Sequence, residues 1–366
     1  MRGRKNRQGA MFYAFNIEQK VRADHPLRPI KKLALAELER LNDRFNAAYS
    51  RFGRPSIPPE TLIMATLLQS LYSIRSERQL CEEIELNMLY RWFLDLKPDD
   101  PVFDHSTFTK NRDRFHEHGL MHAFFDGTVA RAIQEEATSD DHFSVDGTLI
   151  QSMASMKSFR PTDEDHNDPP KSDGPGTKDS SASTARDGNG WADFKGTKRG
   201  NKTHRCRTDP EARLYRKGRG REAKLCHMAH ALMENRNGLL MALDISEANG
   251  HEERNATIRM LKHVRKRHRK RPSTIGQDAG YKGKEHAKEL EKLNVTQHIA
   301  GHKGRKPKGW TASQRVRKRV ESIYGWIKEI AKMDRSRFAG RWKIELQLLA
   351  AGASYNLLRL ANLGAS

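Results

Sequence analysis

Apolar residues recur at helical spacing through the first third of the chain. In the segment IKKLALAELERLNDRF, Leu33, Leu38, Leu41 and Phe45 follow a period close to that of an α-helix. The segment PPETLIMATLLQSLY opens with two prolines, which suit the first turn of a helix. We therefore predict that residues 31–137 form short helices joined by short turns.

Two other segments of this region carry helix-end signals. SERQLCEEIEL begins with a capping box made of Ser76 and Gln79, and HSTFTKNRDRFHEHG ends in Gly119. Short helices with exposed Arg and Lys are typical of a helix-turn-helix module, although a plain helical bundle has the same pattern. Residues 1–138 are therefore predicted to form an all-helical domain, with DNA binding as one of two interpretations.

The pattern changes after residue 138, where strands alternate with helices. HFSVDGTLI reads as a strand, and AKLCHMAHALME and LLMALDISEA read as two strands around the hairpin signal Asn237-Gly238. Residues 157–200 are rich in Pro, Gly, Ser, Asp and Lys, which indicates a loop or a disordered insert. HEERNATIRMLKHVRKRHRK then predicts a helix with a basic end.

The remaining segments complete an α/β order. PSTIGQD and VTQHIAGH read as strands around a helix in KGKEHAKELEKLN, and two helices follow at 311–332 and 342–362. The predicted elements after residue 138 follow the order strand, strand, strand, helix, strand, helix, strand, helix. This is the order of a ribonuclease-H-like mixed sheet. We predict such a domain over residues 139–366, preceded by the helical domain.

Charge adds a partner to this picture. The 366 residues include 67 Lys and Arg against 46 Asp and Glu, a formal net charge of +21. Nucleic acid is the commonest partner of so basic a chain, and a solvated basic surface is the alternative. The three cysteines are widely spaced and no apolar run approaches the about 20 residues that span a bilayer. We expect a cytoplasmic protein with no membrane contact.

Two aspartates stand where strands are expected to end. Asp146 in FSVDGT and Asp278 in IGQDAG each close an apolar run ahead of a glycine turn. In the predicted strand order their strands are neighbours, so the two carboxylates would lie side by side, and one of them would be neutralised unless a cation lies between them. Mg²⁺ binds carboxylate oxygens, which predicts a magnesium site. The alternative is two unrelated aspartates that cap turns.

The helix predicted at 311–332 carries two stripes. The apolar stripe consists of Val316, Val320, Ile323, Ile327 and Ile330. The polar stripe consists of Gln314, Arg317, Glu321, Tyr324 and Lys328. If the apolar stripe packs on the sheet, Glu321 joins Asp146 and Asp278, and three acids suit two metal ions. Arg317 and Lys328 would then hold flanking phosphates.

Together these motifs resemble the DDE transposases of bacterial insertion sequences, closest to the insertion-sequence-five family. DGT at Asp146 and DAGY at Asp278 look like the family's first two acids. RKRVESIYGWIK looks like its catalytic helix, with Arg317, Glu321 and Lys328 at the family's spacing. Related families carry Tyr where this chain has Gln314, which leaves the DNA contact made at that position open.

The resemblance implies both a reaction and its partners. It implies cleavage at the terminal inverted repeats of an element, with Mg²⁺ or Mn²⁺ as cofactor, and strand transfer into target DNA by the freed 3′ hydroxyl. It also implies a homo-oligomer at synapsis and a nucleoid-associated protein of bacteria. FDHSTFTKNRDRF resembles part of the family's DNA-binding region, which makes Lys110, Arg112 and Arg114 candidate DNA contacts beside the polar stripe.

Two other functions share much of this pattern. A metal-dependent nuclease or resolvase would use the same acids without strand transfer. A DNA-binding regulator descended from such an enzyme would need none of them, and the intact acidic set argues against it.

Overall fold

Helices occupy the N-terminal part of the structure, a computed structural model that describes residues 16–50, 52–162, 200–216, 218, 222–301 and 304–364. The N-terminal helices are α1 (Ile17–Lys20), α2 (Leu27–Glu39), α3 (Asn42–Ala48), α4 (Pro59–Leu71), α5 (Glu77–Leu86), α6 (Met88–Phe93), α7 (Ser106–Glu117) and α8 (Leu120–Gln134). The Ser76 hydroxyl caps α5 by accepting from the Gln79 N–H at 3.1 Å, as predicted. Gly119 separates α7 from α8 with a φ of 58°, which glycine adopts without strain.

A mixed sheet follows the helices. Its strands are β1 (His142–Gln151), β4 (Arg213–Tyr215), β5 (Lys224–Glu234), β6 (Leu240–Glu247), β7 (Thr274–Gln277) and β8 (Thr296–Ile299). Two short strands, β2 (Phe159–Pro161) and β3 (His204–Cys206), form a separate antiparallel pair. The order across the main sheet is β6, β5, β1, β7, β8, and β4 extends the β6 edge by pairing with the start of β5. β7 and β8 run parallel to β1, whereas β5 runs antiparallel to it.

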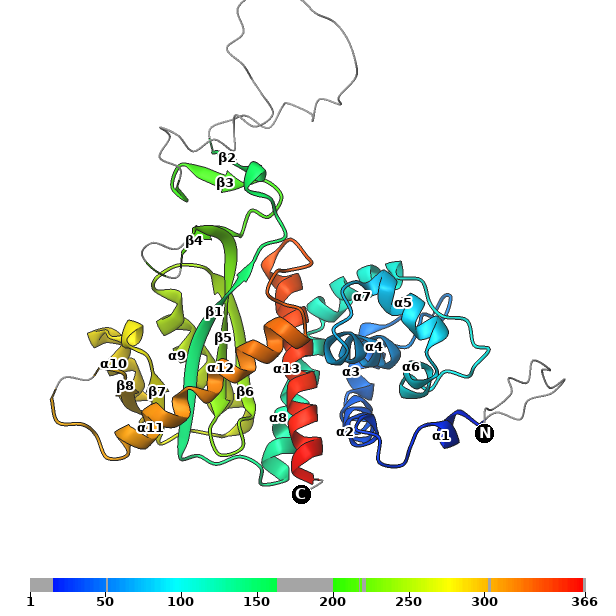
Figure 1. The fold of residues 1–366 in the computed structure, drawn as a ribbon, viewed down its shortest axis with the longest axis horizontal. Helices are drawn as coiled ribbons and strands as arrows, with labels where there is room; N and C mark the ends of the chain where they lie inside the picture. The colour runs from blue at the N-terminus through cyan, green and yellow to red at the C-terminus, as the bar shows by residue number, and fades with distance from the viewer. Residues whose placement is uncertain are drawn as a thin grey trace, which may run out of the picture.

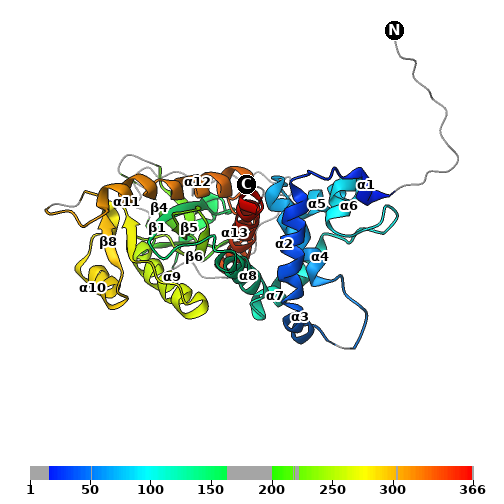
Figure 2. The same cartoon turned by 90° about the horizontal axis from the view of Figure 1, so that it is seen from below.

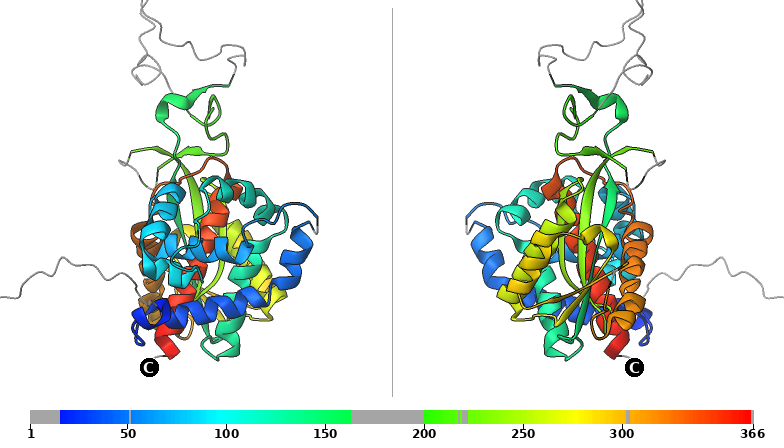
Figure 3. Two further views of the ribbon diagram at one scale, coloured as in Figure 1. Left: turned by 90° about the vertical axis from the view of Figure 1, so that its right-hand side faces the viewer. Right: turned by 90° about the vertical axis from the view of Figure 1, so that its left-hand side faces the viewer.

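Helices cover both faces of the sheet. The helices after β1 are α9 (Glu252–His268), α10 (Lys284–Lys292), α11 (Trp310–Arg317), α12 (Arg319–Gly325) and α13 (Arg341–Gly364). The shorter helical turns are the π-helical η3 (Trp326–Ile330) and the 3₁₀ turns η1 (Met156–Ser158) and η2 (Ala279–Tyr281). Figures 2 and 3 show α9 and α10 on one face and α11 with α12 on the other. The helix between β6 and β7 and the helix after β8 therefore enclose the sheet.

The apolar core is continuous from the N-terminal helices into the sheet. One buried cluster contains Leu62 and Leu68 of α4, Val145 of β1 and Leu349 of α13. In Figure 1, α13 and α8 lie between the sheet and the other N-terminal helices. Gly352 allows α13 to approach β6 closely, since a Cβ there would lie 2.3 Å from a methyl group of Leu243. α13 thus joins the two parts of the chain.

Most of the predicted elements are present, with local differences. The helix predicted from residue 31 is broken into α2 and α3 at residues 40–41, and the short strands β2, β3 and β4 were not predicted. The predicted insert at 157–200 begins with structure, because residues 156–161 form η1 and β2, and residues 163–199 lie outside the described residues. None of the described helices combines the length and apolar character that crossing a bilayer requires.

Candidate active site

The pairing of β1 with β7 places Asp146 and Asp278 at matching positions. The last residue pair of these parallel strands is Ser144 opposite Gly276, and each aspartate follows two residues later. Residues two apart in extended chain share a face of the sheet. Gly276 faces α11, because a Cβ built on it would lie 3.2 Å from the Ser313 hydroxyl oxygen. Both aspartates therefore occupy positions on the side of the sheet that α11 and α12 cover.

The two aspartates differ in how their strands end. Asp278 directly follows β7, as predicted, but Asp146 lies inside β1, which continues to Gln151. β5 pairs with the other edge of β1 as far as Gln151 opposite Cys226. These ladder hydrogen bonds keep β1 extended after β7 has ended. The expectation that both aspartates end strands is corrected: their equivalence depends on strand register.

A buried tyrosine faces acids from different elements. Tyr281 lies in η2, three residues after Asp278, and its side chain is fully buried. Burial raises the pKa of Tyr281 well above its ordinary value, and the nearby charges of Glu253, Asp146 and Asp278 raise it further. The charges of these three acids therefore act on one phenol.

Glu253, in the first turn of α9, is an acid that the sequence patterns did not identify. Its Oε1 lies 2.8 Å from the position of a Cβ on Gly147, and its Oε2 lies 3.8 Å from that of a Cβ on Gly280. Glu253 thus lies between the glycines that follow Asp146 and Asp278. The glycines after both aspartates were a signal that another group approaches closely, but they did not reveal which element supplies it.

Glu321 lies on α12, exposed and one helical turn before Tyr324. Tyr324 is 7% exposed and donates its hydroxyl hydrogen to the main-chain oxygen of Asp146. Within the described residues, the one group of three His, Cys, Asp or Glu side chains whose ligand atoms all lie within 4.8 Å of one another is a different group, described below. The Glu321 carboxylate is therefore on a helix that contacts β1, but it does not meet Asp146 and Asp278 around a single ion position.

The helix that carries Glu321 is less regular than predicted. Val320, Ile323 and Ile327 of the apolar stripe are buried, but Ile330 is 37% exposed. η3 widens the turn between the last two, because a π-helix bonds residue i to i+5 and rotates the positions that follow. The expectation of one continuous stripe to Ile330 is therefore wrong.

The polar stripe has mixed roles in the structure. The Gln314 amide donates to the main-chain oxygen of His298 at 2.7 Å, and Tyr324 is buried, so both hold the helix to the sheet. Arg317 is half-buried, and its Nε has no hydrogen-bond partner among the described residues. Lys328 lies 3.8 Å from Asp334 Oδ1. Arg317 and Lys328 remain the candidates for phosphate contacts.

The three basic residues of α7 that are candidate DNA contacts differ in how exposed they are. Lys110 is exposed. The Arg112 side chain is only 11% exposed, pairs with Glu77 and lies 4.1 Å from the ring centre of Phe338. Arg114 lies 4.2 Å from the ring centre of Tyr49. Of the three candidate DNA contacts, Lys110 is thus exposed, whereas Arg112 and Arg114 pack against other side chains of the protein.

Family comparisons bear on the same residues. A model described as a transposase domain (DUF772) matches residues 15–114, and one described as a transposase DDE domain matches residues 192–357. Residues 192–357 thus match the DDE domain of transposases. The matched range of this domain includes Asp278 and Glu321, while Asp146 lies before it. The DUF772 match covers most of the helical part that precedes the sheet.

Other comparisons are less informative. The chain described here matches no curated protein. Among solved structures, it is similar to a Mos1 transposase paired-end complex with left transposon end, at 10% identity, a TM-score of 0.22, and coverage of 82% of this chain and 87% of the other. It is also similar to a Mos1 strand transfer complex, at 11% identity, a TM-score of 0.25, and coverage of 90% and 85%.

Proposed function

We propose that this chain binds the terminal inverted repeats of an insertion sequence of the insertion-sequence-five family and catalyses metal-dependent DNA cleavage and strand transfer. The observation that carries the proposal is the matched position of Asp146 and Asp278 on neighbouring parallel strands. We assign these two residues as the first two acids of the DDE set, which the match of residues 192–357 to a transposase DDE domain supports for Asp278. Glu321, which follows on the helix after β8, is the third.

The sheet supports a ribonuclease-H-like core for this chemistry. Its central strand β1 is flanked by the antiparallel β5 and the parallel β7, and β6 and β8 lie outside them. The carboxyl ends of parallel strands gather on one edge of a sheet, where ligands commonly bind. Asp278 stands at this edge, Asp146 lies at the matching position inside β1, and α12 crosses β1 (Figure 1).

The acids fit a hard divalent cation. Asp146, Asp278 and Glu321, with Glu253 close by, offer carboxylate oxygens, the ligand type that Mg²⁺ and Mn²⁺ prefer. When bound, the metal supplies an activated water or hydroxyl and stabilises the leaving 3′ oxygen. The chain's own part is to fix the acids: Tyr324 ties α12 to Asp146, and the register of β1 and β7 aligns the two aspartates.

Cations near these acids are suited to DNA. Arg317 precedes Glu321 by one turn, and Lys328 follows it in η3. Arg305, Lys306 and Lys308 are exposed in the loop that follows β8 at the same edge of the sheet. We assign these residues to the phosphates that flank the cut, with Arg317 offering paired hydrogen bonds and the lysines acting as point charges. Two copies of the chain would hold the two ends at synapsis.

The test separates binding, cleavage and joining. Asp278→Asn and Glu321→Gln keep side-chain size and remove a charge, and Asp113→Asn on the exposed side of α7 is the control. A labelled duplex that ends in the inverted repeat is bound in Ca²⁺ by gel shift, then cut in Mg²⁺ with target DNA present. We expect all three variants to bind the duplex and only the control to cut it at the parent rate.

The outcomes distinguish the competing functions. Cut ends that never join target DNA would favour a nuclease or resolvase. A parent protein that binds the repeat but does not cut it would favour a regulator. Near-parental cutting by Glu321→Gln would remove Glu321 from the metal ligands, and the same test of Glu253→Gln would then show whether α9 supplies the third acid.

A further inference from the structure

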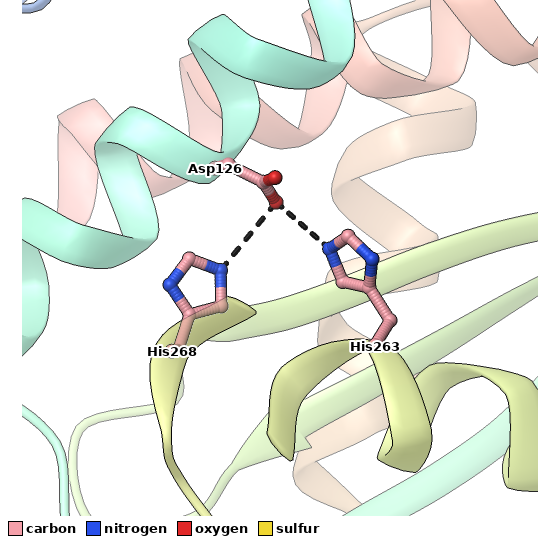
Figure 4. Close-up of side chains that lie close together, drawn as sticks. All are labelled: Asp126, His263 and His268. Carbon is pink, nitrogen blue, oxygen red and sulfur yellow. Dashed lines mark hydrogen bonds and ion pairs between the residues drawn. The ribbon is translucent and has the colours of Figure 1, made fainter. Parts of the chain in front are cut away.

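Asp126 of α8 meets two histidines from the C-terminal part of α9. Asp126 Oδ1 lies 3.0 Å from His263 Nε2 and 3.4 Å from His268 Nε2, and the three ligand atoms all lie within 4.8 Å of one another. Figure 4 shows both rings with a nitrogen directed at the carboxylate. We propose that these three residues bind a divalent transition-metal ion, Zn²⁺ first among them, which joins α8 to α9.

The spacing of the ligand atoms fits this ion. Zn–N and Zn–O bonds of about 2.0–2.2 Å place neighbouring ligand atoms of a tetrahedral site about 3.3 Å apart. The two contacts of Asp126 are close to this value. Two imidazoles and one carboxylate favour Zn²⁺, Co²⁺ or Ni²⁺, whereas Mg²⁺ prefers oxygen ligands throughout. The site therefore selects a different class of metal from that of the DNA-cleaving acids.

The burial of the His268 ring nitrogen Nε2 is a second observation that points to a bound metal ion. Its side chain is 4% exposed, and its Nε2 is buried without a hydrogen-bond partner among the described residues, although it lies 3.4 Å from Asp126 Oδ1. A lone pair on Nε2 would face a carboxylate oxygen, and a proton there would make only a long ion-pair contact of 3.4 Å with Asp126. A metal ion between the two atoms satisfies both.

The surroundings leave room for a fourth ligand and hold the carboxylate in place. Arg267 Nε donates to Asp126 Oδ2 at 3.2 Å, so Oδ1 is left to the two imidazoles. Such a partner orients a metal-binding carboxylate. The His263 side chain is 45% exposed and borders a cavity of about 170 Å³ that His122 and Asp126 also line. A water molecule can reach the remaining position from this cavity.

This site is distinct from the proposed cleavage centre. Glu253 and His263 are ten residues apart on α9, about 15 Å along the helix axis at the usual rise. The ion would instead fix the basic end of α9 against α8, which precedes the sheet. The proposal is thus independent of whether the chain cuts DNA.

The experiment uses the full chain, which is stripped of metal with a chelator. It is kept in excess Mg²⁺, which occupies the site proposed at Asp146, Asp278 and Glu321. Zn²⁺ is titrated by calorimetry, and Co²⁺ is titrated by its visible absorption, which reports the coordination geometry. The variants are His268→Gln and His263→Gln. The control is His122→Gln, which makes the same change in a residue of the same cavity that pairs with Glu345.

We expect the parent and His122→Gln to bind one tight Zn²⁺ that raises the melting temperature, and the two test variants to bind it at least 100-fold more weakly. If His268→Gln fails to fold, the more exposed His263 supplies the same comparison. Equal tight binding in parent and test variants, or no tight site in the parent, would overturn the proposal.

Discussion

The Tyr324 hydroxyl donates to the main-chain oxygen of Asp146 and thereby joins α12 to the strand that carries the first proposed acid. Tyr324 is nearly fully buried, and its pKa is raised well above the ordinary value by burial and then by the Asp146 charge. The phenol therefore stays protonated and remains a donor. The residue that the sequence placed among DNA contacts acts as a link between helix and sheet.

Tyr324→Phe should weaken this link while keeping the ring. Loss of one buried hydrogen bond costs about 0.5–1.5 kcal/mol, so the free energy of unfolding should fall by that amount in urea titrations. Cleavage should fall more than DNA binding, because Asp146 and α12 lose their alignment. Tyr72→Phe, at a tyrosine that is 39% exposed, is the control. Unchanged stability and cleavage would show that the hydrogen bond is dispensable.

Gly147→Ala tests the position of Glu253. The added methyl group would lie 2.8 Å from Glu253 Oε1, and since that oxygen ends a flexible side chain, the carboxylate should turn away at a cost of about 1–3 kcal/mol. If Glu253 helps Asp146 and Asp278 to bind the metal, the rate of Mg²⁺-dependent cleavage should fall as far as in Glu253→Gln, with little loss of DNA affinity. The control is Gly250→Ala, where a Cβ meets nothing within 4 Å. Parental cleavage by Gly147→Ala would leave Glu253 without a role in the reaction.

Stability should depend on pH through His230. This residue is fully buried, and burial lowers its pKa from 6.5 to about 3. Between these values the unfolded chain binds the proton and the folded chain does not, so stability falls as the pH drops below 6.5. One unit of pKa difference corresponds to about 1.4 kcal/mol, which predicts a loss of about 1–2 kcal/mol from this residue between about pH 6.5 and 5.

Urea titrations of the parent and of His230→Gln across this pH range measure the contribution. The slope of unfolding free energy against pH should be smaller in His230→Gln. The exposed residue His118 supplies the matched control variant His118→Gln, which should keep the parental slope. Identical slopes in all three proteins would contradict a neutral His230.

The basic end of α9 should contribute to DNA affinity. Arg265 and Lys266 are exposed in its last turn. Each phosphate contact releases counterions, so Arg265→Ala with Lys266→Ala should reduce the slope of log affinity against log salt by up to about 2. Fluorescence anisotropy between low and physiological salt measures this slope. Lys288→Ala with Lys292→Ala on α10 removes the same charge and should change it less; equal effects would indicate a diffuse field instead of a contact.

Local periodicity determined most of the elements. The two prolines at the start of α4, the capping residues of α5 and the Asn237-Gly238 turn each act within a few residues, so they predict helices and the hairpin before any packing is known. The parallel pairing of β1 with β7 also followed from the order of the elements. The division at residue 138 remains a prediction, since one core runs through both parts.

Only tertiary structure decided which polar residues face outward. Arg112 and Tyr324 fit an exposed polar pattern, yet Glu77 and the Asp146 main chain draw them inward from distant positions. Glu253 reaches the two glycine turns because α9 packs against the sheet, and His268 meets Asp126 across more than a hundred residues. Sequence patterns describe neighbours along one element, whereas these contacts are set by how separate elements pack, which no single period records.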